Sequence, residues 1–420
     1  MRVLVIGNGG REHAIVTKLA QSKRVSQIYC APGNAGTAIL AENVAIGVSE
    51  QERLAEFAIA NAIDLTIVGP EVPLIEGIVD QFELLNLPIF GPRKAAAIIE
   101  GSKTFAKEMM QKYAIPTAKY QVFTNSNEAL AYVRQEGAPI VIKADGLAAG
   151  KGVVVAQTLA EAEQAIVEAM DEKVFGDAGD QVVIEEYLTG QEISLMAFVD
   201  GTTAIPMVIS QDHKPVFDGD KGPNTGGMGT YSPVPQIADE IVQQAIDTII
   251  YPMVDAFHQE GIVYKGVLYA GLMITDEGPK VIEFNARFGD PETQVVLPRL
   301  KTDLVDVFLA VIEGRLGELK IEWSDQAAVC VVMTSPGYPG SYPSGLEITF
   351  PEQIDSHTIV IHAGTKEQDG KAVTAGGRVL GVTALGSTIQ ESQKRAYETV
   401  EKIRFEGAHY RKDIAAKAIL

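Results

Sequence analysis

The stretch from Lys143 to Val155 combines residue types that bind polyphosphates in proteins. It reads Lys-Ala-Asp-Gly-Leu-Ala-Ala-Gly-Lys-Gly-Val-Val-Val, so a glycine-rich turn with a lysine at each side joins two apolar, strand-like runs. Glycines let the backbone approach an anion and point N–H groups at it, and lysines supply compact positive charge. The turn is one residue shorter than a P-loop, and valines follow where a P-loop would open a helix. An ordinary hairpin turn is the alternative.

A second candidate site lies far downstream, in an apolar strand that runs into an acid-rich turn. Strand alternation places Glu283, Asn285 and Arg287 on one face, and Ile282 and Phe284 on the other. Carboxylate and amide oxygens are hard ligands that suit magnesium, and a guanidinium binds phosphate or a developing anion. The two stretches together predict a metal–nucleotide site. A solvated strand face would explain one of these residues but fits the whole row poorly.

Composition limits the class of protein. The 420 residues are enough for two to four domains, and a net charge of −20 argues against nonspecific binding to nucleic acid or an anionic membrane. Cys30 and Cys330 both lie in apolar runs, which predicts buried free thiols and a reducing, cytoplasmic location. No apolar run reaches membrane-spanning length, and the N-terminus does not resemble a signal peptide.

The first hundred residues alternate short apolar strands with amphipathic helices, which predicts a doubly wound α/β domain with a parallel sheet. The loop Gly7–Gly10 follows the first strand, but Glu12 stands where a dinucleotide-binding fingerprint needs its third glycine. The second strand also ends without an acid for a ribose hydroxyl. We therefore expect Gly9, Gly10 and the start of the following helix to bind a single phosphate instead.

Later segments read as a small lid, a strand-rich body and a final α+β domain. The lid would carry the glycine-rich turn in a hairpin of 139–144 and 152–156. A long loop at 211–231 has a donor-rich edge and is typical of a functional or disordered segment. Lys103 lies near a helix start, where a solvated lysine is the alternative to a phosphate contact.

The order of these features resembles the ATP-grasp superfamily. A glycine loop between lysines is followed by Glu185-Glu-Tyr-Leu188, then Glu192, then Glu283-Phe-Asn-Ala-Arg287. Further motifs resemble one family within it, glycinamide ribonucleotide synthetase. They are Gly7-Asn-Gly-Gly-Arg-Glu-His13, Ala31-Pro-Gly-Asn-Ala-Gly-Thr37, Gly69-Pro-Glu-Val-Pro73, Gln211-Asp-His-Lys214, Gly219-Asp-Lys-Gly-Pro-Asn-Thr-Gly-Gly-Met228 and Arg287-Phe-Gly-Asp-Pro-Glu-Thr-Gln294.

The resemblance implies a role for each matching position. Residues 185–188 would pair with the adenine through the backbone, although Glu185 and Glu186 read alone are plain strand-end charges. His213, read alone, is a surface residue. The nucleotide contacts implied are Lys103, Lys143, Gly146, Leu147, Gly150, Lys151, Gly152, Glu185, Glu186, Tyr187, Leu188 and Glu192. The substrate contacts implied are Gly9, Gly10, Glu71, Asp212, His213, Lys214 and Arg287. Glu283 and Asn285 would hold the metal, and Arg287 and Lys143 would be catalytic.

The resemblance also implies a reaction: ATP-dependent ligation of glycine to 5-phosphoribosylamine through glycyl phosphate. It implies Mg²⁺, with Mn²⁺ as a substitute, and we expect a monomer with domains at 1–100, 101–188, 189–315 and 316–420. One departure leaves the number of metal ions open, because the strand at 267–273 has no acidic ligand. The alternatives are another ATP-grasp ligase, a bicarbonate-using carboxylase or a nucleotide sensor without activity.

Overall fold

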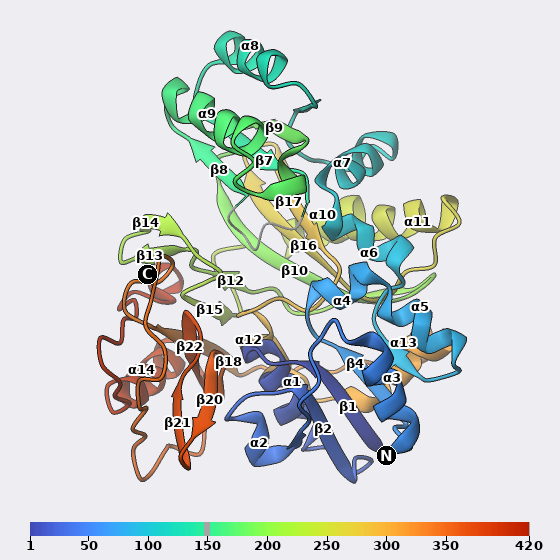
Figure 1. Ribbon diagram of the computed structural model, residues 1–420, viewed down its shortest axis with the longest axis vertical. Coiled ribbons are helices and arrows are strands. Elements are labelled where there is room, and N and C mark those ends of the chain that lie inside the picture. Colours follow the sequence, from blue (N-terminus) through green and yellow to red (C-terminus); the bar gives the residue numbers. More distant parts are fainter. Residues whose placement is uncertain (147–151, 420) are drawn as a thin grey trace.

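The N-terminal domain contains a five-stranded parallel sheet with helices on both faces. A computed structural model describes residues 1–146 and 152–419 (Figure 1). The sheet order β3-β2-β1-β4-β5 confirms the doubly wound pattern. Gly77 has a φ of 96° and separates two consecutive helices, Glu71–Glu76 and Ile78–Leu84. The elements are β1 (Arg2–Gly7), α1 (Gly10–Leu19), β2 (Gln27–Pro32), α2 (Thr37–Leu40), β3 (Glu42–Asn43), α3 (Gln51–Ala60), β4 (Leu65–Val68), α4 (Glu71–Glu76), α5 (Ile78–Leu84) and β5 (Ile89–Phe90).

Two helices link this domain to a small lobe that stands at the top of Figure 1. Its antiparallel sheet has the order β6-β9-β7-β8, and the predicted hairpin is confirmed by the pairing of β7 with β8. The lobe has an apolar core of its own beneath the helices. The elements are α6 (Lys94–Gly101), α7 (Lys103–Lys112), β6 (Tyr120–Phe123), α8 (Ser126–Glu136), β7 (Ile140–Ala144), β8 (Val153–Ala156), α9 (Leu159–Ile166) and β9 (Val182–Glu186).

The body beneath the lobe is a second antiparallel sheet, ordered β11-β10-β16-β17. A bulge opposite Gly271 and Leu272 leaves Ile282 unpaired in β17. The bulge breaks the expected alternation: Val281 and Phe284 both belong to the apolar core, and Ile282 lines the cavity beside Glu283, as Phe284 also does. The elements are β10 (Gln191–Asp200), β11 (Ala204–Pro206), α10 (Asp239–Ala245), α11 (Tyr251–Gln259), β16 (Lys265–Thr275) and β17 (Gly278–Asn285).

The segment 211–231 is not a structureless loop, contrary to the expectation. Two of its strands enter the C-terminal sheet, whose order is β12-β15-β18-β22-β19, and two others pair as a hairpin. The C-terminal domain thus draws strands from two distant parts of the chain. Its elements are β12 (Gln211–Asp212), β13 (Pro215–Phe217), β14 (Lys221–Asn224), β15 (Gly229–Ser232), α12 (Thr293–Val296), β18 (Ala327–Thr334), β19 (Thr358–His362), β20 (Thr365–Gln368), β21 (Lys371–Thr374), β22 (Arg378–Gly386) and α14 (Ile389–Val400). Helix α13 (Leu304–Glu313) packs instead against β10, β16 and β5.

The N-terminal and C-terminal domains contact each other directly. His362 donates its backbone N–H to Nδ1 of His13, and Asn34 donates to the carbonyls of His362 and Ala363. Burial lowers the pKa of His13 to about 3 and that of His362 to about 4, so both rings are neutral at physiological pH. Within the described ranges, none of the helices is long and apolar enough to span a membrane.

Candidate active site

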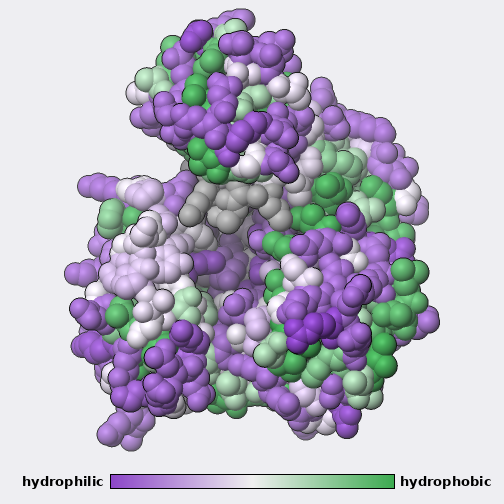
Figure 2. Space-filling view, in the orientation of Figure 1, coloured by the Kyte–Doolittle hydropathy of each residue, from purple (hydrophilic) through white to green (hydrophobic). Residues whose placement is uncertain are grey.

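A cavity of about 430 Å³ lies where the small lobe, the body and the two flanking domains meet. Figure 2 shows a hollow between the lobe and the lower domains, with hydrophilic residues around it. The lining side chains come from elements as distant in sequence as α1 and β22. Basic and acidic groups both line it. The charged residues of the lining are Arg11, Glu71, Glu100, Lys103, Lys107, Lys143, Glu185, Asp212, Lys214, Glu283, Arg287, Asp290, Glu292 and Arg378.

Three lysines, Lys103, Lys107 and Lys143, form one side of the cavity, which we call the lysine end. Lys143 in β7 donates to the carbonyl of Ile282 at 2.9 Å and pairs with Glu185 Oε1 at 2.8 Å. Lys103 at the start of α7 donates to the carbonyl of Gly146. That contact places Lys103 beside the first glycine of the turn. Burial lowers the pKa of Lys103, so this lysine is not a solvated surface charge.

Glu185 is the shared partner of two of these lysines. Its carboxylate is 4% exposed and also lies 3.0 Å from Lys107 Nζ. Burial lowers the pKa of Lys107 to about 8, while Glu185 opposes the shift. Glu185 is therefore a buried cavity residue, and the interpretation as a strand-end surface charge is wrong. Three ammonium groups thus converge on one side of the cavity, an arrangement that suits a polyphosphate.

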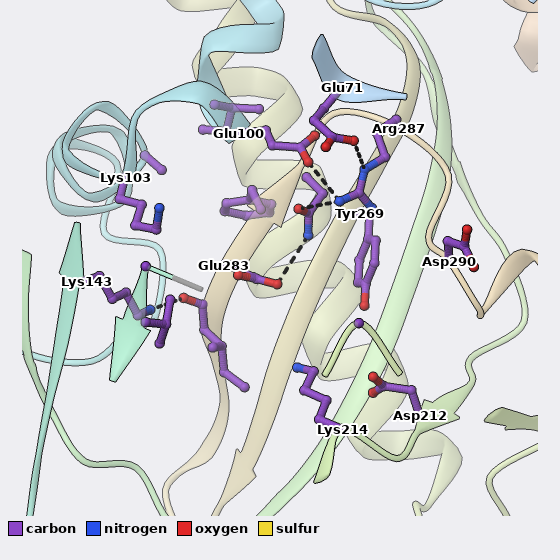
Figure 3. Close-up of a pocket in the computed structure, with 18 of the residues that line it drawn as sticks. Glu71, Glu100, Lys103, Lys143, Asp212, Lys214, Tyr269, Glu283, Arg287 and Asp290 are labelled. Carbon is purple, nitrogen blue, oxygen red and sulfur yellow. Dashed lines mark hydrogen bonds and ion pairs between the residues drawn. The ribbon is translucent and has the colours of Figure 1, made fainter. Parts of the chain in front are cut away.

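Glu283 and Asn285 lie beside the lysine end on β17, facing the cavity (Figure 3). Burial acts to raise the pKa of Glu283, but Lys214, Lys143 and other cations nearby hold it below its ordinary value. The side chain is therefore an ionised oxygen donor. No group of three or more His, Cys, Asp or Glu side chains in the described ranges could hold a metal ion. Magnesium fits this site if nucleotide oxygens and water complete its coordination.

The opposite side of the cavity, which we call the arginine end, contains the guanidiniums of Arg11, Arg287 and Arg378. Each is fixed by protein groups. Arg11 Nε pairs with Glu12 at 2.6 Å and its NH1 donates to the carbonyl of Phe288. Arg378, from the C-terminal domain, donates to the carbonyls of Gly226 and Asp290. These contacts orient each fork before any ligand binds.

Arg287 has the most extensive set of partners. Its NH2 donates to Asn285 Oδ1 at 3.1 Å and pairs with Glu100 Oε1 at 2.8 Å. In the described part of the chain, its buried Nε has no hydrogen-bond partner and lies 3.6 Å from Glu71 Oε2. Figure 3 shows both carboxylates against the guanidinium. The expected metal ligand Asn285 is thus connected directly to the expected catalytic arginine.

A third group, at the edge of β12, contains Asp212 and Lys214. Lys214 Nζ pairs with Glu192 Oε2 at 2.8 Å. The hydroxyl of Tyr269 donates a hydrogen bond to Glu292 Oε1 at 2.6 Å. Burial, with Glu292 and Glu192 nearby, raises the pKa of Asp212 to about 7, although Lys214 opposes the shift. The cavity therefore has a weakly acidic carboxyl group close to neutral pH, on the side away from the lysine end.

Comparison with known proteins identifies this arrangement. Phosphoribosylglycinamide synthetase models match residues 1–100 as the N domain, residues 101–293 as the ATP-grasp (A) domain and residues 328–417 as the C domain. The chain belongs to the phosphoribosylglycinamide synthetase family. The resemblance inferred from the motifs is therefore confirmed, as is the fold class, in which an ATP-grasp core lies between N-terminal and C-terminal domains. The four expected domain ranges stay a prediction.

Full-length relatives agree with the phosphoribosylglycinamide synthetase family. The phosphoribosylamine–glycine ligase of Caldanaerobacter subterraneus subsp. tengcongensis is 56% identical over 416 residues, covering 99% of this chain and 100% of that protein. The crystal structure of phosphoribosylamine–glycine ligase from Thermotoga maritima is 36% identical, with a TM-score of 0.84 over 99% of this chain and 100% of that one. A biotin carboxylase domain from Hydrogenobacter thermophilus, solved with ADP, magnesium and bicarbonate, shares the fold at 16% identity and a TM-score of 0.74 over 97% and 91%.

The synthetase fold brings most of the predicted site residues to one cavity. The predicted residues that line it are Glu71, Lys103, Lys143, Gly146, Gly152, Glu185, Asp212, Lys214, Glu283, Asn285 and Arg287. Those that do not line it are Gly9, Gly10, Glu186, Tyr187, Leu188, Glu192 and His213. Leu147, Gly150 and Lys151 lie outside the described residues. Glu192 nevertheless contacts the cavity residue Lys214.

His213 does not face the cavity of this synthetase. Its ring is 1% exposed, and its Nε2 accepts the backbone N–H of Ala415 near the C-terminus. Burial and the nearby Arg411 lower its pKa to about 4, so the ring is neutral. Strand alternation explains the difference, because Asp212 and Lys214 point to the side opposite His213. His213 thus does not line the cavity in this structure, and its expected contact with substrate stays a prediction.

The start of α1 is also not an open phosphate site. Gly9 donates its N–H to Glu12 Oε2 at 2.7 Å, and Arg11 donates its N–H towards Asp290 Oδ2 at 3.4 Å. These two carboxylates occupy the positive end of the helix dipole. A Cβ on Gly10 would lie 2.6 Å from Gln294 Nε2, so Gly10 packs against α12. In this structure the helix start therefore packs against the neighbouring domain.

Sequence reasoning did not assign six of the charged cavity residues: Arg11, Glu100, Lys107, Asp290, Glu292 and Arg378. Lys107 lies four positions after Lys103, so helical spacing could have placed both lysines on one face. Asp290 and Glu292 stand in the acid-rich turn, but Glu100 and Arg378 have no comparable signal. Arg378 follows a pair of glycines in a turn-rich stretch, and Glu100 stands near the end of a largely apolar helix.

Proposed function

We propose that this chain joins glycine to 5-phosphoribosylamine, with ATP as the source of energy, in purine biosynthesis. The observation that carries this proposal is the combination of family membership over the full chain with a single cavity that has distinct lysine, metal and arginine sides. The lysine end suits a polyphosphate, Glu283 and Asn285 suit a divalent ion, and the arginine end suits a phosphosugar.

The reaction needs glycine's carboxylate to become a better acyl donor. Transfer of the γ-phosphoryl group of ATP forms a bond from a carboxylate oxygen of glycine to phosphorus and releases ADP. The amine of phosphoribosylamine then attacks the carbonyl carbon, phosphate leaves, and the amine loses a proton as the amide forms. In such chemistry the protein contributes mainly position and charge neutralisation.

We assign the nucleotide to the lysine end. Lys103 and Lys143 would neutralise phosphate oxygens, and Gly152 with Gly146 lines the adjoining wall of the cavity. Glu283 and Asn285 would hold magnesium, for which manganese is the natural substitute, and the ion would neutralise charge on the transferred phosphoryl group. Residues 185–188 border this end through Glu185, which supports an adenine site along β9.

We assign glycine to the side that contains Asp212. Glycine brings an ammonium group, which the ionised form of Asp212 would bind. Asp212, with Glu292 nearby, provides negative charge away from the lysine end. Arg287 then lies on the side where the carboxylate of glycine and the phosphoryl group would meet.

We assign phosphoribosylamine to the arginine end, not to the start of α1. Arg378 and Arg11 flank Asp290 there, and Thr225 and Gly226 complete the wall. Fixed guanidinium forks suit a phosphate monoester. Glu71, at the start of α4, is placed to accept hydrogen bonds from ribose hydroxyls at the same end.

One assay tests the function. ADP release is measured with freshly generated phosphoribosylamine and either glycine or bicarbonate as the acceptor. We expect release that depends on glycine and formation of glycinamide ribonucleotide. Release that depends on bicarbonate would contradict the proposal and favour a carboxylase. This chain shares only its fold with the biotin carboxylase domain.

A further inference from the structure

Glu100 contacts the β17 end of the active site at two points. Its Oε2 accepts the backbone N–H of Ala286 at 2.7 Å, and its Oε1 pairs with Arg287 NH2 at 2.8 Å. The side chain is 7% exposed, so water competes little for either contact. One carboxylate thus fixes both the backbone and the guanidinium of the two residues that follow Asn285.

The position of Glu100 in the fold gives these contacts a wider role. Glu100 is in α6, at the boundary between the segments matched by the N-domain and ATP-grasp models. Helix α6 packs against α4, which begins at Glu71, and against β17. Two carboxylates from outside the body, Glu71 and Glu100, therefore converge on Arg287, as Figure 3 shows.

The geometry of the two contacts differs. The Glu100 pair is close and shares its carboxylate with a backbone N–H, whereas Glu71 stands 3.6 Å from an Nε that forms no hydrogen bond among the described residues. Glu100 is thus the close support of the guanidinium, whereas Glu71 lies farther away across the buried Nε. A guanidinium held by a fixed carboxylate is already oriented when an oxyanion arrives.

We propose that Glu100 is a positioning residue of the ligase, which orients Arg287 for the phosphoryl and acyl groups without touching substrate. This inference rests on the proposed function. Since Glu100 acts through Arg287 and lies away from the lysine end, its removal should lower kcat and leave the KM for ATP almost unchanged. Its effect should also disappear when the guanidinium is absent.

A double-mutant cycle tests this. Glu100→Gln keeps the shape and one acceptor oxygen but removes the charge, and Arg287→Met removes the guanidinium. We expect Glu100→Gln to lower kcat about tenfold, with the KM for ATP within twofold of the wild type, because a weakened charged hydrogen bond costs roughly 1.5 kcal/mol. In the Arg287→Met background, Glu100→Gln should change kcat less than twofold.

The matched control is Glu83→Gln, which removes a carboxylate from the exposed pair of Glu83 with Arg93. It should leave kcat unchanged. Thermal unfolding of every variant is followed in parallel. Each single variant leaves one buried charge without its partner, which can destabilise the fold, whereas the double variant removes both charges of the pair.

The positioning role would be overturned if Glu100→Gln lowered kcat by the same factor in the Arg287→Met background as in the wild type. A Glu100→Gln enzyme with normal kcat would overturn it as well. Wild-type enzyme that fails to release ADP with glycine would instead refute the proposed function. The two failures are therefore distinguishable.

Discussion

The lysine end and the arginine end of the cavity achieve positive charge in different ways. Lys107 and Lys143 share one carboxylate, and Lys103 donates to a backbone carbonyl. At the arginine end each guanidinium has partners of its own, such as Glu12 for Arg11 and Glu100 for Arg287. One end presents ammonium groups that share a carboxylate, and the other presents guanidinium forks that each have carboxylate or carbonyl partners of their own.

The difference matches what each end is proposed to bind. A polyphosphate with a metal ion brings many negative charges whose positions shift as the phosphoryl group is transferred, so compact, adjustable ammonium groups suit it. A phosphate monoester or an acyl phosphate has a defined shape, which a planar fork can recognise if the fork is already oriented. Charge dominates at the lysine end, and geometry dominates at the arginine end.

The largest effect is expected at the lysine end. Lys143→Met should raise the KM for ATP about a hundredfold, since a charge-assisted contact of about 3 kcal/mol is lost while Glu185 keeps Lys107 as a partner. Steady-state kinetics with ATP varied would measure it. Lys173→Met, which disrupts an exposed pair in the same lobe, is the control. Equal losses for both variants would mean that the lobe is merely destabilised.

The metal site should respond next. Glu283→Gln retains an oxygen but loses the negative charge, so the magnesium concentration for half-maximal rate should rise roughly tenfold to thirtyfold. Magnesium titration at saturating ATP checks this. Glu277→Gln in the adjacent turn, where Glu277 pairs with Lys280, should leave the magnesium requirement unchanged. An unchanged requirement in Glu283→Gln would remove that residue from the metal site.

The arginine end should show a smaller and more selective effect. Arg378→Gln should raise the KM for phosphoribosylamine about tenfold and keep the KM for ATP within twofold, because one oriented fork is lost far from the lysines. Initial rates with each substrate varied would separate the two constants. If the KM for ATP rises instead, the division of the cavity into two ends is wrong.

The smallest effect is a change in pH dependence. With a pKa of about 7, Asp212 is ionised above pH 7 and becomes neutral below it, so the KM for glycine should rise as pH falls from 8 to 6. Asp212→Asn should raise that KM about fivefold at pH 8, because the amide keeps an oxygen but no charge. It should also flatten the pH profile. A persisting rise at low pH in the variant would assign the titration to another group.

Local sequence patterns predicted much of the fold because they depend on near neighbours. The alternation of short apolar strands with helices predicted the parallel sheet, and a glycine turn between valine-rich runs predicted the pairing of β7 with β8. Patterns failed where a neighbour in space intervened. The bulge opposite Gly271 turned Ile282 towards the cavity, and pairing with β18 gave order to a segment expected to be a loop.

The sequence by itself determined the chemical types at the site: lysines around a glycine turn, and a carboxylate, an amide and a guanidinium spaced two residues apart on one strand. Only the tertiary structure decided their partners. Glu100 is 186 residues from Ala286, and Arg378 comes from the last domain, so no periodicity within a helix or strand records either contact. Both depend on how separate elements pack, and that packing fixes which charges are paired and which are left for a ligand.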